Sequence, residues 1–223
     1  MDVITAIKTR ISTRAFLPDA LPQSDIEEIL NIARYSPSSS NLQPWGTIVV
    51  TGAEKQAISD LAIKAFKSQA PSEEGDYPIY PKDLPQKYQD RRAGVGKGMY
   101  ELMGIKRDDM AARMNWVIDN YNFYGAPVAV FFTIDRLHGR NQWASLGMFM
   151  QSVCLVAEAK GYATCMQEIW AQVRDSIHKQ LKLDENQVIY AGMALGKADP
   201  EAPVNTLRTE REPVEGFAKF VGF

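Results

Sequence analysis

The strongest constraint on the fold is a long apolar helical pattern between about residues 140 and 160. The apolar positions of this pattern recur every three or four residues: Trp143, Leu146, Gly147, Met150, Val153, Cys154 and Ala157. Such spacing places them along one stripe of an α-helix. Only Glu158 and Lys160 interrupt the apolar character. We therefore expect this helix at the centre of the fold, packed against other elements.

Strands and helices alternate unevenly around the central helix. β-branched and apolar runs predict strands at 46–51, 127–134, 162–167 and 187–196. Helical spacing predicts helices at 2–11, 24–33, 53–69 and 172–182, with Ser24 and Glu27 forming a capping box. Uneven alternation favours an α+β fold, in which a mixed central sheet is flanked by helices.

The chain length of 223 residues is compatible with one domain spanning 1–223. Residues 70–92 are rich in proline, tyrosine and charge, and they run into a glycine-spaced, helical-looking stretch. A connection of this length inside a domain is either a lid or a plain surface excursion. We expect a lid-like excursion around 70–124. The last segment, 205–223, ends with Phe217, Phe220 and Phe223.

Composition excludes several classes of function. The net charge of -2 and the pI near 5.8 provide no field that attracts nucleic acid. No apolar stretch is long enough to span a membrane, and the N-terminus has no signal core, so we expect a cytoplasmic protein. Neither the two cysteines nor the two histidines have ligand spacing, so no metal site is expected.

Two groups of residues are suited to binding an anion. Arg10, Ser12 and Arg14 alternate at the end of the first predicted helix, and Arg208 and Arg211 lie near the C-terminus. Guanidinium groups bind phosphate through paired, charge-assisted hydrogen bonds. The alternative is simple solvation, with the C-terminal arginines paired to Glu210 and Glu212. A third unusual stretch is the polar loop "SPSSSNLQPW" at 36–45, hereafter the serine loop.

Four ordered motifs carry a family resemblance that extends over nearly the whole chain. They are "RISTRAF" at 10–16, the serine loop, "GYATCMQEIW" at 161–170 and "RTEREP" at 208–213. In order and approximate spacing they resemble the FMN-dependent nitroreductase family. "NFYGAPVAVFF" and "AGMALGKADPEAPVN" are similar to the branch that includes nitrobenzoate-type and dinitroaniline-type nitroreductases.

The resemblance implies an intertwined homodimer with FMN at the subunit interface, and the segment 205–223 then serves as a dimer arm. Packing of this arm onto its own subunit is the alternative. The resemblance also implies the FMN contacts. Those to the phosphate and ribityl chain are assigned to Arg10, Ser12, Arg14 and Arg211. Those from the second subunit are assigned to Pro37, Ser38, Ser39 and Asn41. Gln167, Glu168 and Ile169 are expected along the flavin ring edge, and Gln142 is a candidate for contact with its pyrimidine ring.

The implied activity is transfer of a hydride from NADH or NADPH through FMN to a small aromatic acceptor, by a ping-pong mechanism. Nitroaromatics and quinones are the expected acceptors. The flavin does the difficult chemistry, so no side chain is assigned as an essential acid. The 77–124 segment is expected to form a variable wall over the flavin. Its aromatic residues are Tyr77, Tyr80, Tyr88, Tyr100, Tyr121, Phe123 and Tyr124.

Two alternatives remain at this point. The first is reductive dehalogenation of a halophenol, with Tyr88, Glu101 and Lys106 clamping an amino-acid zwitterion as in a neighbouring branch of the superfamily. The second is a flavin-binding protein without turnover. Its only hint is the pair Glu168 and Ile169, where better-known members often carry a glycine pair or Glu-Gly.

Overall fold

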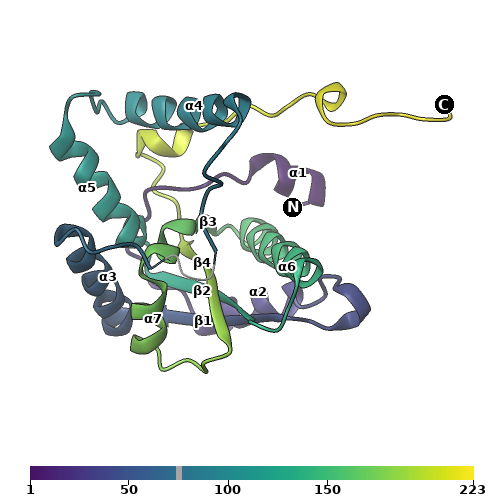
Figure 1. Cartoon of the computed structure of the whole chain (residues 1–223), viewed down its shortest axis with the longest axis horizontal. Helices are drawn as coiled ribbons and strands as arrows, with labels where there is room; N and C mark the ends of the chain where they lie inside the picture. Colours follow the sequence, from purple (N-terminus) through teal and green to yellow (C-terminus); the bar gives the residue numbers. More distant parts are fainter. Residues whose placement is uncertain (74–76) are drawn as a thin grey trace.

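A four-stranded sheet forms the centre of the computed structural model, which describes residues 1–73 and 77–223 (Figure 1). The strands are β1 (Trp45–Thr51), β2 (Val128–Asp135), β3 (Ala163–Gln167) and β4 (Gln187–Gly196), in the order β1-β2-β4-β3. All three neighbouring pairs are antiparallel. The α+β class is confirmed. The mixed sheet expected from the sequence is antiparallel in these four strands, and Ser12 adds a parallel bridge to Thr164 of β3.

Side chains of the buried strand β2 alternate between two apolar cores, one on each face of the sheet. Val128, Val130 and Phe132 belong to one core, and Ala129 and Phe131 belong to the other. This alternation follows from the two-residue period of a strand. A strand buried on both faces has a continuous apolar sequence, which is why the predicted strand at 127–134 differs from β2 by only one residue at each end.

Helices cover both faces of the sheet and give the molecule three layers (Figure 1). One face carries α2 (Gln23–Ala33) and α6 (Arg140–Ala159), and the other carries α3 (Gly52–Lys67), α5 (Met110–Tyr121) and α7 (Arg174–Gln180). The helix α6 contacts α1 (Val3–Thr9), α2 and three strands, in agreement with the central position predicted for it.

Two N-terminal predictions are corrected by local capping. The first helix, α1, spans only Val3–Thr9, because Asp2 caps its start by accepting from the N–H of Thr5 and Arg10 leaves helical geometry at ψ 125°. The capping box at Ser24 is wrong. Pro22 occupies the N-cap position of α2, so Ser24 lies inside the helix. Proline presets the backbone for a helix start without a side-chain cap.

The excursion after α3 contains more helix than predicted. The helix α4 (Gln86–Leu102) starts inside the stretch expected to be irregular, immediately after Pro85. Before it, the Glu73 carboxylate accepts hydrogen bonds from the Ser176 N–H at 3.0 Å and hydroxyl at 2.6 Å, which fixes the excursion to α7. Residues 74–76, part of the predicted lid, lie outside the described residues.

The C-terminal segment first follows α4 and then leaves the body of the molecule (Figure 1). Glu212 forms an ion pair with Arg91 of α4. Beyond it, Phe217, Phe220 and Phe223 are 71%, 68% and 105% exposed, so the body of the molecule does not cover these three side chains. In the described part of the chain, no helix has the length and apolar character needed to cross a membrane.

Candidate functional site

The segment from Arg10 to Arg14, hereafter the basic segment, runs extended beside β3. Thr13 donates its N–H to the Thr164 carbonyl at 3.0 Å, next to the bridge between Ser12 and Thr164. Alternate residues of an extended chain share one face. Thr13 is buried, whereas Arg10, Ser12 and Arg14 are half-buried. The structure therefore brings the three predicted anion-binding residues into one region.

Arg14 is held in place by its surroundings. Its N–H donates to the side-chain carbonyl of Asn205 at 2.8 Å, and its guanidinium donates to the Ser12 carbonyl at 3.2 Å. Asn205 in turn donates to the Ala15 carbonyl. Burial raises the pKa of the Tyr124 hydroxyl, and the nearby Arg14 charge opposes that shift. The basic segment is thus fixed from two sides, by β3 and by the loop that carries Asn205.

The strand β3 ends at Gln167, three residues beyond Thr164, which contacts the basic segment. The end of the strand is therefore roughly 10 Å from that contact, measured along the strand. The Gln167 side chain is buried there. Its amide donates to the backbone and side-chain oxygens of Asn120, both at 2.7 Å. The side chain of Gln167 therefore fixes α5 and faces away from solvent. Glu168 and Ile169 follow at the surface, where partial desolvation raises the pKa of the Glu168 carboxyl.

The serine loop packs on α6 and not on the basic segment. The Ser38 hydroxyl accepts from the Gln43 N–H at 3.0 Å, and the Ser39 N–H donates to the Ser145 hydroxyl at 3.4 Å. Three non-glycine residues of the loop, Ser40, Asn41 and Gln43, have positive φ angles. Within the described residues, no hydrogen bond joins this loop to the basic segment or to the end of β3. Pro37, Ser38, Ser39 and Asn41 therefore form a separate exposed or half-buried surface.

Two further candidates have local roles in the single chain. The Gln142 side chain accepts from the Gly139 N–H at 3.2 Å and so caps the start of α6. Arg211 is exposed and donates to the carbonyls of Thr209 and Glu210. No hydrogen bond or ion pair connects Arg211 to the basic segment in the part of the chain that the structure describes.

The predicted aromatic wall is wrong for Tyr121 and Phe123, which are 1% and 0% exposed and belong to the core, where Phe123 stacks on Trp170 at 4.4 Å. Tyr124 is 9% exposed and packs on the same core, but it also lines a cavity beside Arg14. The helix that carries Tyr121 packs on the sheet, which the sequence pattern did not reveal. Tyr77 packs edge-on against Trp143, and its hydroxyl donates to the Tyr190 carbonyl.

Sequence reasoning also missed a cavity of about 520 Å³ beside Arg14. Trp116, Asp119 and Asn122 of α5 and the turn after it line the cavity together with Tyr124. Asp119 and Asn122 are three residues apart, the spacing at which side chains of one helical turn become neighbours. That spacing was visible in the sequence, but nothing there indicated that the turn faces the basic segment.

The three residues of the dehalogenation hypothesis do not converge within one chain. Tyr88 and Glu101 both lie on α4, thirteen residues and therefore roughly 20 Å apart along the helix axis. Glu101 instead pairs with Lys97 at 3.8 Å. The amino-acid clamp that this alternative requires is not assembled in the chain.

Comparison with known proteins gives consistent matches over most of the chain. The model of the nitroreductase family matches residues 7–197. The 4-nitrobenzoate reductase of Pseudomonas putida is 40% identical, and the match covers 100% of this chain and 96% of that protein. The crystal structure of the FMN and NADPH-dependent nitroreductase NfnB from sphigopyxis sp. strain HMH superposes with a TM-score of 0.94 at 37% identity, covering all of both chains. NfnB from Mycobacterium smegmatis in complex with NADPH gives 0.92 at 28% identity, covering 99% of this chain and 100% of that chain.

Proposed function

The chain belongs to the nitroreductase family, and from this membership we propose that it transfers a hydride from NAD(P)H through bound FMN to nitroaromatic acceptors. The observation that carries the proposal is the position of the basic segment. Arg10, Ser12 and Arg14 lie beside β3, and the end of that strand displays Glu168 and Ile169.

The donor set of the basic segment fits the phosphate and ribityl part of FMN. Two guanidinium groups and a hydroxyl occur within five residues, with no acidic residue among them. Arginine pairs with phosphate oxygens through parallel hydrogen bonds, and a hydroxyl donates to the same kind of oxygen. We assign Arg10, Ser12 and Arg14 to this end of the cofactor, with Arg211 joining them through movement of the C-terminal segment or from a partner chain.

The residues after β3 supply the ring end of the site. FMN, when bound, accepts a hydride from the pyridine nucleotide and delivers reducing equivalents to the acceptor. With the FMN phosphate at the basic segment, the edge of the flavin ring would lie beside Glu168 and Ile169. The buried Gln167 holds this turn through Asn120 and therefore acts as a positioning residue. We propose a ping-pong order, in which donor and acceptor use the same open face in turn, and we include quinones among the acceptors.

A homodimer completes the proposed site. The serine loop lies apart from the basic segment in one chain, and its small polar side chains suit close approach to a flavin supplied by a second copy. Exposed apolar side chains on two terminal segments support the same assembly. They are Val3, Ile4 and Ile7 of α1 and Phe217, Phe220 and Phe223 of the tail.

The first experiment is the visible spectrum of the purified protein under anaerobic conditions. We expect a yellow protein that bleaches when NADPH or NADH is added and regains its colour when 4-nitrobenzoate follows. A colourless protein that takes up no added FMN would overturn the assignment of the basic segment. A yellow protein that pyridine nucleotide does not bleach would indicate flavin binding without turnover.

Substitution of Arg10 tests the phosphate assignment directly. Arg10→Ala removes one charge-assisted contact, so we expect the FMN dissociation constant to rise about tenfold or more. The dissociation constant is measured by flavin fluorescence during a titration with FMN. Arg34→Ala is the control, because Arg34 is an exposed arginine at the end of α2, away from the basic segment. Equal FMN affinity in the two variants would remove Arg10 from the site.

A further inference from the structure

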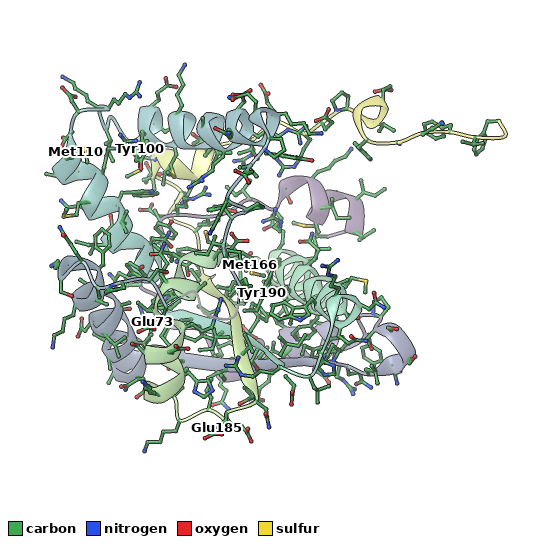
Figure 2. The ribbon with its side chains drawn as sticks, viewed as in Figure 1. Glu73, Tyr100, Met110, Met166, Glu185 and Tyr190 are labelled. Carbon is green, nitrogen blue, oxygen red and sulfur yellow. The ribbon has the colours of Figure 1, made fainter. Side chains whose placement is uncertain are left out.

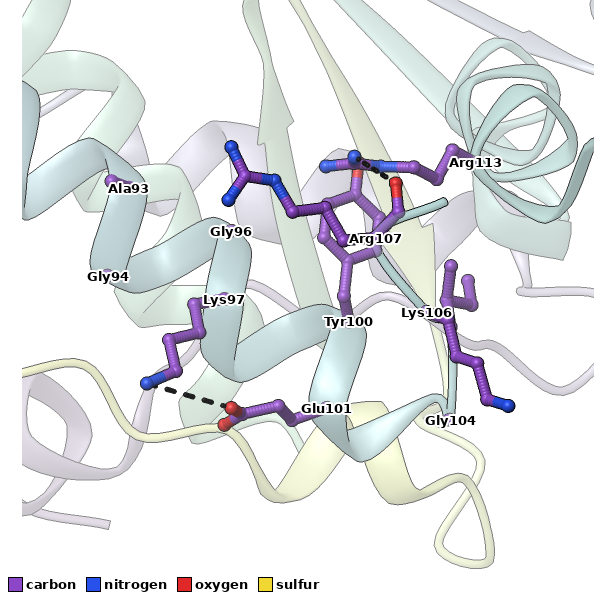
Figure 3. A pocket seen from close by; sticks show the side chains of 11 residues that line it. Ala93, Gly94, Gly96, Lys97, Tyr100, Glu101, Gly104, Lys106, Arg107 and Arg113 are labelled. Carbon is purple, nitrogen blue, oxygen red and sulfur yellow. Dashed lines mark hydrogen bonds and ion pairs between the residues drawn. The ribbon is translucent and has the colours of Figure 1, made fainter. Parts of the chain in front are cut away.

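A cleft of about 940 Å³ lies between the C-terminal half of α4 and the start of α5. Figure 3 shows it from close by, with Gly94 and Gly96 on one wall and Tyr100 at the base. The residues between the two helices, including Ile105 and Arg107, close the opposite side. This cleft is distinct from the basic segment and from the cavity beside Arg14.

Two glycines of the cleft, Gly94 and Gly96, have no packing reason in the described part of the chain. A β-carbon added to Gly94 or to Gly96 would meet no atom within 4 Å. Glycine in a helix interior destabilises the helix relative to alanine. Gly98 differs, since its β-carbon would lie 3.1 Å from Leu207. The bare backbone at Gly94 and Gly96 leaves room for a flat group to lie against α4.

Two arginines place positive charge in the cleft. The Arg113 guanidinium lies 4.5 Å from the centre of the Tyr100 ring and donates to the Arg107 carbonyl at 3.0 Å, which fixes the turn between the helices. The Arg107 side chain reaches back over α4 toward Gly96 in Figure 3. Among the described residues it has no hydrogen-bond or ion-pair partner. Lys97, by contrast, pairs with Glu101.

The position of the cleft decides which anion it suits. Asn120 at the other end of α5 contacts Gln167, and Arg113 is seven residues earlier, roughly 10 Å away along the helix axis. Figure 2 shows the same separation, with Met166 of β3 near the middle of the molecule and Tyr100 and Met110 at its edge. A one-ring acceptor at the flavin cannot reach so far. The distal end of a dinucleotide can.

We propose that this cleft binds the 2′-phosphorylated adenosine of NADPH and makes the enzyme prefer NADPH over NADH. Arg107 pairs with the 2′-phosphate, and the adenine lies along the glycine wall beside Ile105. The inference rests on the proposed function, because it assigns the far end of the hydride donor used at the flavin.

Binding of two nucleotide fragments tests the cleft without turnover. Adenosine 2′,5′-bisphosphate and AMP differ by the 2′-phosphate, so we expect the bisphosphate to bind the holoenzyme at least tenfold more tightly. Arg107→Ala should abolish that difference, and Arg107→Lys should retain part of it. Gly96→Leu fills the cleft while keeping its charge and should weaken bisphosphate binding as well. Lys87→Ala, an exposed lysine at the start of α4, is the control.

Steady-state kinetics separate the possible failures. Arg107→Ala should raise KM for NADPH roughly tenfold, with kcat and the KM for NADH unchanged. Equal binding of the two fragments by the wild-type protein would overturn the inference, while normal oxidation of NADH with nitrobenzene would leave the proposed function intact. If Arg107→Ala raised the KM for 4-nitrobenzoate but not for nitrobenzene, the cleft would bind the acceptor. That result would also overturn the inference.

Discussion

Ser40 of the serine loop has a φ of 51°, a left-handed conformation that an L-residue adopts at a cost of roughly 1–2 kcal/mol. Asn41 and Gln43 share this feature. The loop keeps its shape because Ser38 and Ser145 accept hydrogen bonds from its backbone. Clustered backbone strain of this kind is common at binding sites.

The strain at Ser40 gives a stability prediction. Ser40→Val introduces a β-branched side chain that disfavours positive φ, whereas Ser40→Gly removes the penalty. We expect the free energy of unfolding, measured in urea, to be about 1–2 kcal/mol lower for the valine variant than for the glycine variant. Equal values would mean that the loop relaxes out of this conformation in solution.

Cys165 gives a pH prediction. Burial raises the pKa of its thiol from 9.0 to about 11. The unfolded chain therefore releases this proton first, so the stabilising contribution is complete below pH 9 and is lost as the pH rises toward 11. The loss is at most roughly 1.4 kcal/mol per pH unit. Urea unfolding at about pH 9 and about pH 10 should show a smaller decrease for Cys165→Ala than for the wild type. If the free energy of unfolding decreased equally in the two proteins, a group other than the Cys165 thiol would be responsible for the pH dependence.

At the scale of elements, the contact between β4 and the turn after β3 depends on a missing side chain. A β-carbon on Gly192 would lie 2.3 Å from Cδ1 of Trp170. Trp170 is fully buried and stacks on Phe123, so it has no space into which to move. This packing holds the turn that carries Glu168 and Ile169.

Gly192→Ala should consequently destabilise the protein by about 1–3 kcal/mol through overpacking, measured by urea or thermal unfolding. The matched control is Gly94→Ala, where a β-carbon meets nothing within 4 Å and the helix gains up to about 1 kcal/mol. If both variants shifted stability in the same direction, the Trp170 contact would not be the cause.

The element scale also shows where sequence patterns are sufficient. The strand at 187–196 is predicted to the residue, because its largely apolar run lies between the polar stretch 184–186 and the charged Lys197, which mark its two ends. The start of α4 is missed because its residues, from Gln86 to Asp90, carry no apolar stripe. That helix is supported by local hydrogen bonds such as Gln86 to Asp90, and it buries no residue fully.

At the scale of the whole molecule, the C-terminal tail exposes apolar side chains that the body of the molecule does not cover. Three phenylalanines on a segment that leaves the body expose a large area to water, and each buries roughly 150–250 Å² when covered. A second copy of the chain supplies such cover in the assembly proposed above. The same contact would bring the serine loop of one chain to the flavin of the other.

Replacing Phe217, Phe220 and Phe223 with serine together tests this assembly. We expect the wild type to behave as a dimer in light scattering and the triple variant to shift toward monomer. Retained FMN should fall in parallel, because each site would lose the partner's serine loop. Val49→Ser, which alters an exposed apolar residue on β1, serves as the control. If the triple variant remained dimeric and retained its full content of FMN, the tail would not be part of the dimer interface.

The sequence by itself determined the α+β class, the buried strands and the proximity of Arg10, Ser12 and Arg14. Local periodicity specifies these features, because alternate residues of a strand share a face and an apolar stripe must be covered. Only the tertiary structure decided that Gln167 faces inward to Asn120, that Tyr121 and Phe123 are core residues, and that Arg107 reaches over the glycines of α4. These are contacts between residues distant in sequence, and no local pattern specifies which side chain meets which once the layers pack.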